Sequence, residues 1–337
     1  METLTLNSPF DMHLHLRDGE MLENVIKYTA QNFASALVMP NLQTPIVNVD
    51  LAIAYKQRIL QACKMQGIEN FMPLISLYLT PSLDKAELTR AKEMGIFILK
   101  LYPKGATTGS ESGVKEILDS RVLEILEIAQ SLGMVLSIHG ESNGFVMERE
   151  VEFHPVFEAL AKNFPKLRII FEHLSDHRSI ALVEKYENLF ATLTLHHILL
   201  SLDNVVGGML NPHYFCKPIL KTKKDQEALL QVALSAHSKF SFGSDSAPHL
   251  RSAKESSKGA AGIFSAPILL PLLAQTFASK NVLEKLESFV SHNAHKIYQL
   301  PLSQKSVKLC KKPMTIPQEC YGVVPMLAGE TLEWSVA

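Results

Sequence analysis

The chain alternates between short apolar runs and longer amphipathic segments along most of its 337 residues. The apolar runs are rich in β-branched and aromatic residues and show little apolar–polar alternation, which is typical of strands buried on both faces of a parallel sheet. The eight predicted strands are Leu4–Leu16, Ala34–Pro40, Phe71–Leu79, Ile96–Tyr102, Met134–His139, Leu167–His173, Leu189–Leu195 and Phe240–Ser244.

The segments between these runs carry apolar residues near i, i+3, i+4 and i+7, which predicts amphipathic helices. The clearest are Val49–Met65, Asp84–Met94, Val114–Leu132, Val156–Asn163 and Lys224–His237. Eight β-then-α units in series favour a closed (β/α)8 barrel, the TIM-barrel form of an α/β fold, over an open sheet.

The predicted barrel domain covers residues 1–300. Residues 301–337 are punctuated by Pro and Lys and are expected to form a C-terminal extension of the same domain, packed on the barrel. Pro103–Gly113 is rich in Gly, Ser and Thr and is predicted to be a mobile loop, whereas Leu199–Thr222 is a long insertion after the seventh strand.

Composition narrows the class of partner. The formal net charge is -1 and no Lys/Arg run is long enough to bind nucleic acid, so a small-molecule substrate is expected. No apolar stretch reaches the roughly 20 residues of a membrane span, and the first residues lack the pattern of a signal peptide. The four cysteines form no CxxC pair and are expected to be reduced, so the predicted location is the cytoplasm.

Metal-ligand residue types recur where the predicted strands end, and in such a barrel the chemistry lies at the C-terminal ends of the strands. These candidate ligands are His13, His15, Lys100, His139, His173 and Asp245. His13 and His15 are two apart on a strand, so their side chains point to the same side. A lone His-x-His pair is weak evidence, but five strand ends together predict a metal centre. Imidazole and carboxylate without thiolate favour zinc.

Lys100 lies within an otherwise apolar strand, where an unpaired ammonium is costly to bury. The lysine could extend to the rim or pair with Asp245. Alternatively, reaction with carbon dioxide would give a carbamate (N6-carboxylysine), an anion able to bridge two metal ions. Two divalent ions bring more positive charge than Asp245 and a hydroxide remove, which favours the carbamate.

The remaining histidines receive a structural interpretation. His196 and His197 follow the seventh strand and are candidates to hydrogen-bond to the metal ligands without binding the metal themselves. The others fall in predicted helices or loops and are not expected to bind metal: His154, His177, His213, His237, His292 and His295.

Several motifs resemble those of the dihydroorotases, in particular the shorter, bacterial-type class of the amidohydrolase superfamily. They are DMHLHLRDG (11–19), VMPN (38–41), KLYP (100–103) followed by Thr107 and Thr108, HGE (139–141), FEH (171–173), GSDSAPH (243–249) and KESSKGAAGIFSAP (254–267). The resemblance spans nearly the whole chain.

The resemblance implies two zinc ions per subunit. His13, His15 and Asp245 would hold the first and His139 and His173 the second, with carboxylated Lys100 as the bridge. A bridging hydroxide would be the nucleophile in the hydrolytic direction and Asp245 the general acid/base. The substrate-binding residues would be His15, Arg17, Asn41, His139 and His249, with the backbone of Lys217 and Ala261, and Thr107 and Thr108 would form a lid.

The implied reaction is the reversible cyclisation of N-carbamoyl-L-aspartate to L-dihydroorotate in de novo pyrimidine synthesis, and the implied assembly is a homodimer. Lys217 departs from the family pattern, which is usually apolar there. One alternative is a related cyclic amidase such as a hydantoinase, from which Arg17, Asn41 and His249 would distinguish the chain because they require an anionic substrate. The other is a catalytically inactive homologue that serves as an assembly partner.

Overall fold

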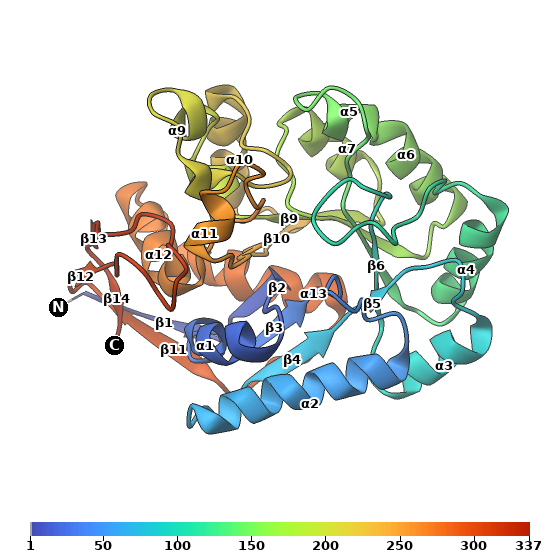
Figure 1. The fold of residues 1–337 in the computed structure, drawn as a ribbon, viewed down its shortest axis with the longest axis horizontal. Coiled ribbons are helices and arrows are strands. Elements are labelled where there is room, and N and C mark those ends of the chain that lie inside the picture. The colour runs from blue at the N-terminus through green and yellow to red at the C-terminus, as the bar shows by residue number, and fades with distance from the viewer. Residues whose placement is uncertain (1) are drawn as a thin grey trace.

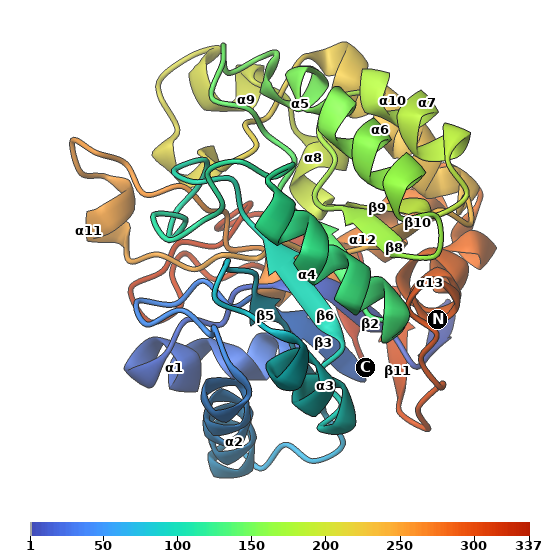
Figure 2. The same cartoon turned by 90° about the vertical axis from the view of Figure 1, so that its right-hand side faces the viewer.

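The computed structural model describes residues 2–337 and contains two parallel sheets that follow one another around a barrel (Figures 1 and 2). The first has the order β2–β3–β4, and the second is six-stranded with the order β10–β9–β8–β7–β6–β5. The barrel strands are β2 (Phe10–Leu14), β3 (Ser35–Val38), β4 (Met72–Ile75), β5 (Leu77–Tyr78), β6 (Ile98–Leu101), β7 (Val135–Ile138), β8 (Arg168–Phe171), β9 (Leu189–Leu193) and β10 (Phe240–Phe242).

β4 and β5 are two parts of one predicted strand, interrupted at Ser76, so the two sheets supply the eight strands of the barrel. The circle closes where β2 meets the end of β10: Asp245 N donates to His13 O at 2.8 Å and His15 N donates to Ser246 O at 3.1 Å. The (β/α)8 prediction is confirmed.

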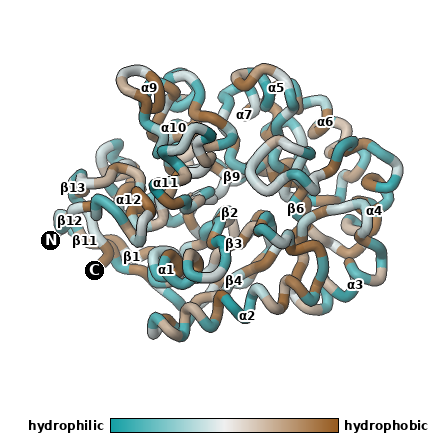
Figure 3. The backbone as a smooth tube through the Cα atoms, viewed as in Figure 1, coloured by the Kyte–Doolittle hydropathy of each residue, from teal (hydrophilic) through white to brown (hydrophobic). Residues whose placement is uncertain are grey.

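Helices surround the barrel. Five of them correspond to the helices named from the sequence: α2 (Val49–Met65), α3 (Lys85–Glu93), α4 (Ser120–Ser131), α6 (His154–Asn163) and α10 (Lys223–Ser235). The structure adds α1 (Gly19–Ala30), α5 (Arg149–Glu152), α7 (Arg178–Lys185), α8 (Leu195–Leu199), α9 (Asp203–Val206), α11 (Arg251–Lys254), α12 (Leu269–Ser279) and α13 (Asn293–Tyr298). The tube of α2 alternates between brown and teal in Figure 3, because one face is buried and the other is solvated.

Two predicted elements differ from the structure. The run Leu4–Leu16 is not one strand, because the chain turns at Ser8, whose φ of 47° ends an extended conformation. The part before the turn is β1 (Thr3–Asn7), which pairs antiparallel with β11 (Ser306–Cys310) outside the barrel. The helix expected from Val114 begins only at Ser120, because Val114 forms a bridge with Pro103 and closes the loop between them.

Residues 301–337 form β11 and three shorter strands, β12 (Met314–Thr315), β13 (Thr331–Leu332) and β14 (Ser335–Val336). Figure 1 places them beside β1 and α12, so both ends of the chain lie on the same side of the barrel.

Inside the barrel, the inward side chains change character along each strand. Near the N-terminal ends they are apolar, including Ile98, Val135 and Ile170, and α13 covers this end with Ile297 and Tyr298. Two residues further along, the same face carries Lys100 on β6 and Ser137 on β7. The two-residue period of a strand therefore builds an apolar floor beneath a polar rim.

No helix within residues 2–337 combines the length and the apolar character that a membrane crossing needs.

Candidate metal centre

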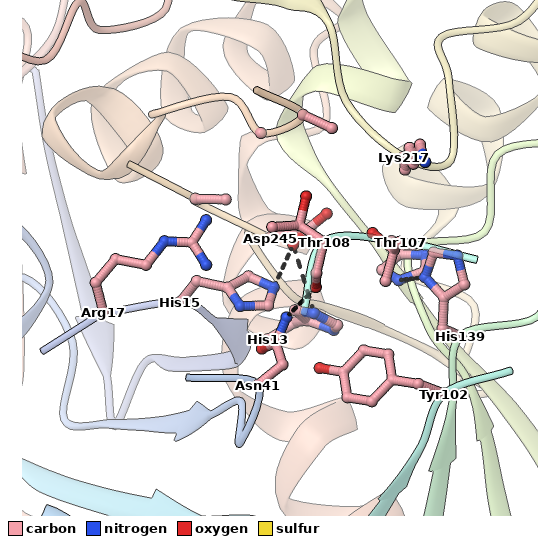
Figure 4. A pocket seen from close by; sticks show the side chains of 14 residues that line it. His13, His15, Arg17, Asn41, Tyr102, Thr107, Thr108, His139, Lys217 and Asp245 are labelled. Atoms are coloured by element: carbon pink, nitrogen blue, oxygen red, sulfur yellow. Dashed lines mark hydrogen bonds and ion pairs between the residues drawn. The ribbon is translucent and has the colours of Figure 1, made fainter. Parts of the chain in front are cut away.

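The predicted ligands converge on one end of the barrel from five strands. Figure 4 shows His13 and His15 on one side of a pocket, His139 on the other, and Asp245 above them. The pocket has an empty volume of about 360 Å³. Its lining includes His13, His15, His139, His173 and Asp245, whereas Lys100 is completely buried.

The first group consists of His13, His15 and Asp245, whose potential ligand atoms all lie within 4.8 Å of one another. The Asp245 Oδ1 atom is 3.0 Å from His15 Nε2 and 3.4 Å from His13 Nε2. Burial lowers the pKa of His15 to about 4, so this imidazole is neutral near pH 7. Burial alone would raise the pKa of Asp245, but the adjacent imidazoles of His13 and His15 outweigh it and hold the pKa well below its usual value.

The second group is the pair His139 and His173. His139 Nδ1 lies 3.1 Å from His173 Nε2, and the other nitrogen of His173, Nδ1, is buried without a hydrogen-bond partner among the described residues. Burial, and then the neighbouring His139, lower the pKa of His173 well below its usual value. His173 is therefore placed to offer a nitrogen lone pair rather than a positive charge.

Two carboxylates set the tautomers of these rings. Glu172 Oε2 accepts from His13 Nδ1 at 2.8 Å, and Glu141 Oε2 accepts from His139 Nε2 at 2.8 Å. Each imidazole thus has its proton on the side away from the pocket, and its lone pair faces Asp245 in one case and His173 in the other. The lone pair of His13 faces the Asp245 carboxylate, and the two repel unless a cation lies between them, so the donor set fits a divalent metal ion.

The surroundings of Lys100 also fit a metal centre at this rim. Its Nζ atom is buried with no hydrogen-bond partner among residues 2–337, and its nearest described aromatic contact is the Tyr102 ring, with Nζ 5.1 Å from the centroid. Burial lowers the pKa of Lys100 to about 8, although the charges of Glu172 and Asp245 act in the opposite direction. The pairing with Asp245 that the sequence left open is absent from the salt bridges of the described residues.

Three rim residues adopt a left-handed backbone: Arg17 (φ 61°), His173 (φ 41°) and Asp245 (φ 45°). Non-glycine residues in this region cost energy and often occur at functional sites. Hydrogen bonds offset the cost: Tyr55 donates to Arg17 O at 2.6 Å, and the His173 amide donates to Thr192 Oγ1 at 2.7 Å.

The predicted anion-binding residues lie beside the metal-ligand groups. Arg17 donates through Nε to Pro248 O at 3.2 Å, and its Nη2 atom is 2.9 Å from His249 Nε2. Asn41 Nδ2 donates to Thr108 O at 2.9 Å, while its Oδ1 is buried without a partner among the described residues. Burial and the charge of Arg17 lower the pKa of His249 to about 3, so Arg17 is the positive charge of this trio.

The loop predicted as a lid lies against the rim. Thr107 and Thr108 both line the pocket, and Ser110 fixes the loop by donating to Thr107 O at 2.6 Å while accepting from Thr107 N at 2.9 Å. Tyr78 donates to Gly109 O at 3.3 Å. Lys217 and Ala261 also line the pocket, and Figure 4 shows Lys217 on the side opposite Asn41.

Sequence reasoning missed Glu172, Glu141 and Tyr102. The signal was available for the two carboxylates, since Glu172 precedes His173 and Glu141 is two residues after His139. Tyr102 lies two residues after Lys100, on the same face of the strand. Its hydroxyl is buried without a partner among the described residues, and the ring lines the pocket (Figure 4).

Two other groups of possible ligands occur in residues 2–337, and hydrogen bonding argues against both. In the group His196, His197 and Cys216, both ring nitrogens of His197 already bond, to Thr194 Oγ1 at 2.8 Å and Pro218 O at 3.1 Å. Cys216 Sγ donates to Pro218 O at 3.1 Å, so only His196 in this group has ring nitrogens without partners among the described residues. The group Asp176, His177 and Asp225 is a closed network with Arg178 and Thr222.

The chain resembles proteins of one family throughout. The model of the amidohydrolase family matches residues 9–302. A dihydroorotase from Helicobacter hepaticus is 57% identical over 340 residues, which covers 99% of this chain and 98% of the relative.

Solved structures agree. The crystal structure of dihydroorotase from Campylobacter jejuni has a TM-score of 0.93 and 44% identity, and the alignment covers 99% of this chain and 97% of that one. The Saccharomyces cerevisiae dihydroorotase in complex with 5-fluoroorotic acid has a TM-score of 0.92 and 34% identity, covering 100% and 99%. An L-hydantoinase from Arthrobacter aurescens, at 15% identity and a TM-score of 0.82 over 99% of this chain and 83% of that one, shares the fold alone.

Proposed function

The chain belongs to the amidohydrolase family, and from this premise we propose that it catalyses the dihydroorotase reaction, the reversible cyclisation of N-carbamoyl-L-aspartate to L-dihydroorotate with loss of water. This places the protein in pyrimidine biosynthesis, as a hydrolase that acts on cyclic amides. The observation that carries the proposal is the combination of inward-facing imidazole lone pairs with the cation Arg17 at the same rim.

We propose that the metal ions are zinc, two per subunit. His13, His15 and Asp245 would hold one and His139 and His173 the other. Lys100 would join them as N6-carboxylysine. The absence of thiolate from the set favours zinc held by nitrogen and oxygen. When bound, the ions would supply water ionisable near pH 7 and polarise the carbonyl of the substrate.

Carboxylation of Lys100 would resolve two costs at once. An ammonium without a partner is expensive to bury, and it would repel the metal ions nearby. The uncharged amine would form a bond from its nitrogen to the carbon of carbon dioxide and release one proton to solvent, which leaves a carbamate anion. The metal ions would then be the partners of the anion, whereas the Nζ atom now has no hydrogen-bond partner among the described residues.

Substrate orientation would depend on Arg17, Asn41 and His249. Both substrates carry a carboxylate, and the guanidinium can bind it through two parallel hydrogen bonds. Asn41 Oδ1 and Nδ2 offer an acceptor and a donor beside it. The Saccharomyces relative was crystallised with 5-fluoroorotic acid, a pyrimidine carboxylic acid, which supports a ligand of this class here.

Asp245 would move the proton. In the hydrolytic direction water adds to the ring carbonyl carbon, the carbon–nitrogen bond breaks, and Asp245 carries a proton from the water to the departing nitrogen. Because its carboxyl has a pKa well below the usual value, Asp245 is ionised at rest and can accept that proton. Thr107 and Thr108 would close over the substrate and limit access of other water. We further propose a homodimer in the cytoplasm.

The test compares dihydroorotate with an uncharged hydantoin on zinc-loaded protein. Dihydroorotate should be preferred by at least about 100-fold in kcat/KM, because an unpaired Arg17 gains nothing from the uncharged ring. Asp245→Asn should lose about 10²–10⁴ in kcat. Native mass spectrometry should detect one added carbon dioxide, absent from Lys100→Ala.

Preference for hydantoin would establish the related cyclic amidase instead. If the zinc-loaded protein turned over neither compound, the alternative of a catalytically inactive homologue that serves as an assembly partner would be favoured.

A further inference from the structure

Lys254, at the end of α11, is a buried lysine outside the set of ligands and anchors. It is 3% exposed, although lysine is seldom fully buried. Its Nζ atom donates to three backbone carbonyls: Phe215 O at 2.8 Å, Ala260 O at 2.8 Å and Gly262 O at 2.7 Å. An ammonium has three N–H groups, so each one is used.

The three carbonyls come from two segments that line the pocket. Ala260 and Gly262 flank Ala261, and Phe215 precedes Lys217 by two residues. The Gly262 amide also donates to Phe215 O at 2.9 Å, so this oxygen joins both segments and Lys254. Lys254 therefore holds the backbone on both sides of Ala261 and ties it to the segment that leads to Lys217.

The position of this backbone is tightly limited on the pocket side. A Cβ atom on Gly262 would lie 2.7 Å from Ala247 O and 2.9 Å from His249 Cδ2, so only glycine allows the approach. His249 Nε2 is 3.0 Å from Ala261 O, and the same nitrogen lies 2.9 Å from Arg17 Nη2. A displacement of Ala261 would therefore also displace the proposed anion anchors.

We propose that Lys254 is a positioning residue for substrate binding, which fixes the backbone of Ala261 and Lys217 at the rim through the carbonyls of Phe215, Ala260 and Gly262. The inference rests on the proposed function, since it assigns those two backbone segments to substrate contact. Lys254 itself does not line the pocket, and its Nζ atom bonds to backbone carbonyls alone.

The chain offers a matched control in Lys239, which precedes β10 at the opposite end of the barrel from Asp245. Its Nζ atom also donates to backbone carbonyls, those of Val183 at 2.7 Å and of Tyr186. A role limited to stability would make Lys254 and Lys239 equivalent. A positioning role predicts that only Lys254 affects substrate affinity.

The experiment is steady-state kinetics on zinc-loaded protein with dihydroorotate, with zinc content measured on every variant. Lys254→Met, similar in length but unable to donate, should raise KM at least about tenfold and change kcat by less than about threefold. Lys239→Met should lower the melting temperature while its KM stays at the wild-type value. An unchanged KM in Lys254→Met would overturn the inference, whereas a wild type inactive on dihydroorotate would overturn the proposed function.

If Lys254→Met does not fold, a second variant, Lys254→Arg, tests the positioning role of Lys254. Burial lowers the pKa of Lys254 to about 8, and the titratable groups that interact electrostatically with it are Cys216, His196 and His249. A neutral amine has only two N–H groups, so the wild-type KM should rise as the pH passes about 8. Lys254→Arg stays charged and should lack that rise. Identical pH profiles of KM for the two proteins would overturn the inference.

Discussion

At the residue scale, the chemistry of the rim depends on which nitrogen of each histidine carries its proton. Glu172 is completely buried and also accepts from Thr192 Oγ1 at 2.6 Å and from Ser137, so it cannot turn away from His13. Burial acts to raise its pKa, but the neighbouring His13 and Lys100 and the hydrogen bonds from His13 and Ser137 outweigh burial and lower it. An ionised, fixed carboxylate thus keeps the lone pair of His13 directed toward Asp245.

Tyr102 carries the first prediction at this scale. Burial raises the pKa of Tyr102 well above 10, so its hydroxyl remains a hydrogen-bond donor at neutral pH, and it lines the pocket with no partner among the described residues. We expect it to donate to the substrate, and Tyr102→Phe should lower kcat/KM for dihydroorotate about tenfold, the effect of one hydrogen bond.

Tyr298→Phe is the matched control for Tyr102→Phe. The Tyr298 hydroxyl is also buried without a partner among the described residues, but it lies in the apolar floor beneath the rim. Its kinetics should equal those of the wild type. Equal kinetics for both variants would contradict a role of Tyr102 in substrate binding.

At the scale of elements, the rim depends on loops that are folded onto it rather than on the strands alone. The loop that contains Thr107 and Thr108 is closed by the bridge between Pro103 and Val114 and by the hydroxyl of Ser110, which is completely buried. This hydroxyl accepts a hydrogen bond from the amide of Thr107 and donates one to the carbonyl of the same residue. Loss of the hydroxyl would leave both groups to find other partners.

The prediction for this loop concerns Ser110→Ala. Two hydrogen bonds are lost, each with a net contribution of about 1 kcal/mol, so KM for dihydroorotate should rise by up to about 30-fold and amide hydrogen exchange should speed up across residues 104–113. Ser131→Ala removes a similar bond, to Ile128 O at 2.7 Å at the end of α4, and should change neither measurement. Unchanged amide hydrogen exchange in the loop of Ser110→Ala would contradict the proposal that the Ser110 hydroxyl stabilises the loop.

At the scale of the whole molecule, barrel and C-terminal extension share one core. Trp334 is completely buried and belongs to the same apolar cluster as the barrel helices, together with Val307, Leu309 and Leu332. The chain should therefore unfold as one cooperative unit.

Trp334→Ala tests this expectation. It should lower the free energy of unfolding by about 3–5 kcal/mol, measured by urea denaturation, with a single transition retained and zinc content unchanged. Leu302→Ala, at an exposed side chain of the same extension, should change it by less than about 0.5 kcal/mol. Two separate transitions in the wild type would show that the extension folds apart from the barrel.

The sequence by itself determined the barrel and the membership of the rim. Apolar runs without alternation mark strands buried on both faces, and a polar residue at the end of such a run can only lie at the carboxyl edge. This local rule placed His13, His15, His139, His173 and Asp245 together, as the distances between them bear out.

Only the tertiary structure decided which distant residues contact and hydrogen-bond to those side chains. The division of Leu4–Leu16 into β1 and β2 depends on a partner strand at the far end of the chain, β11. The tautomers depend on Glu172 and Glu141, and the bonds of Lys254 join carbonyls from two distant loops. Local patterns record which face a side chain takes, but contacts between distant segments exist only once the barrel has closed.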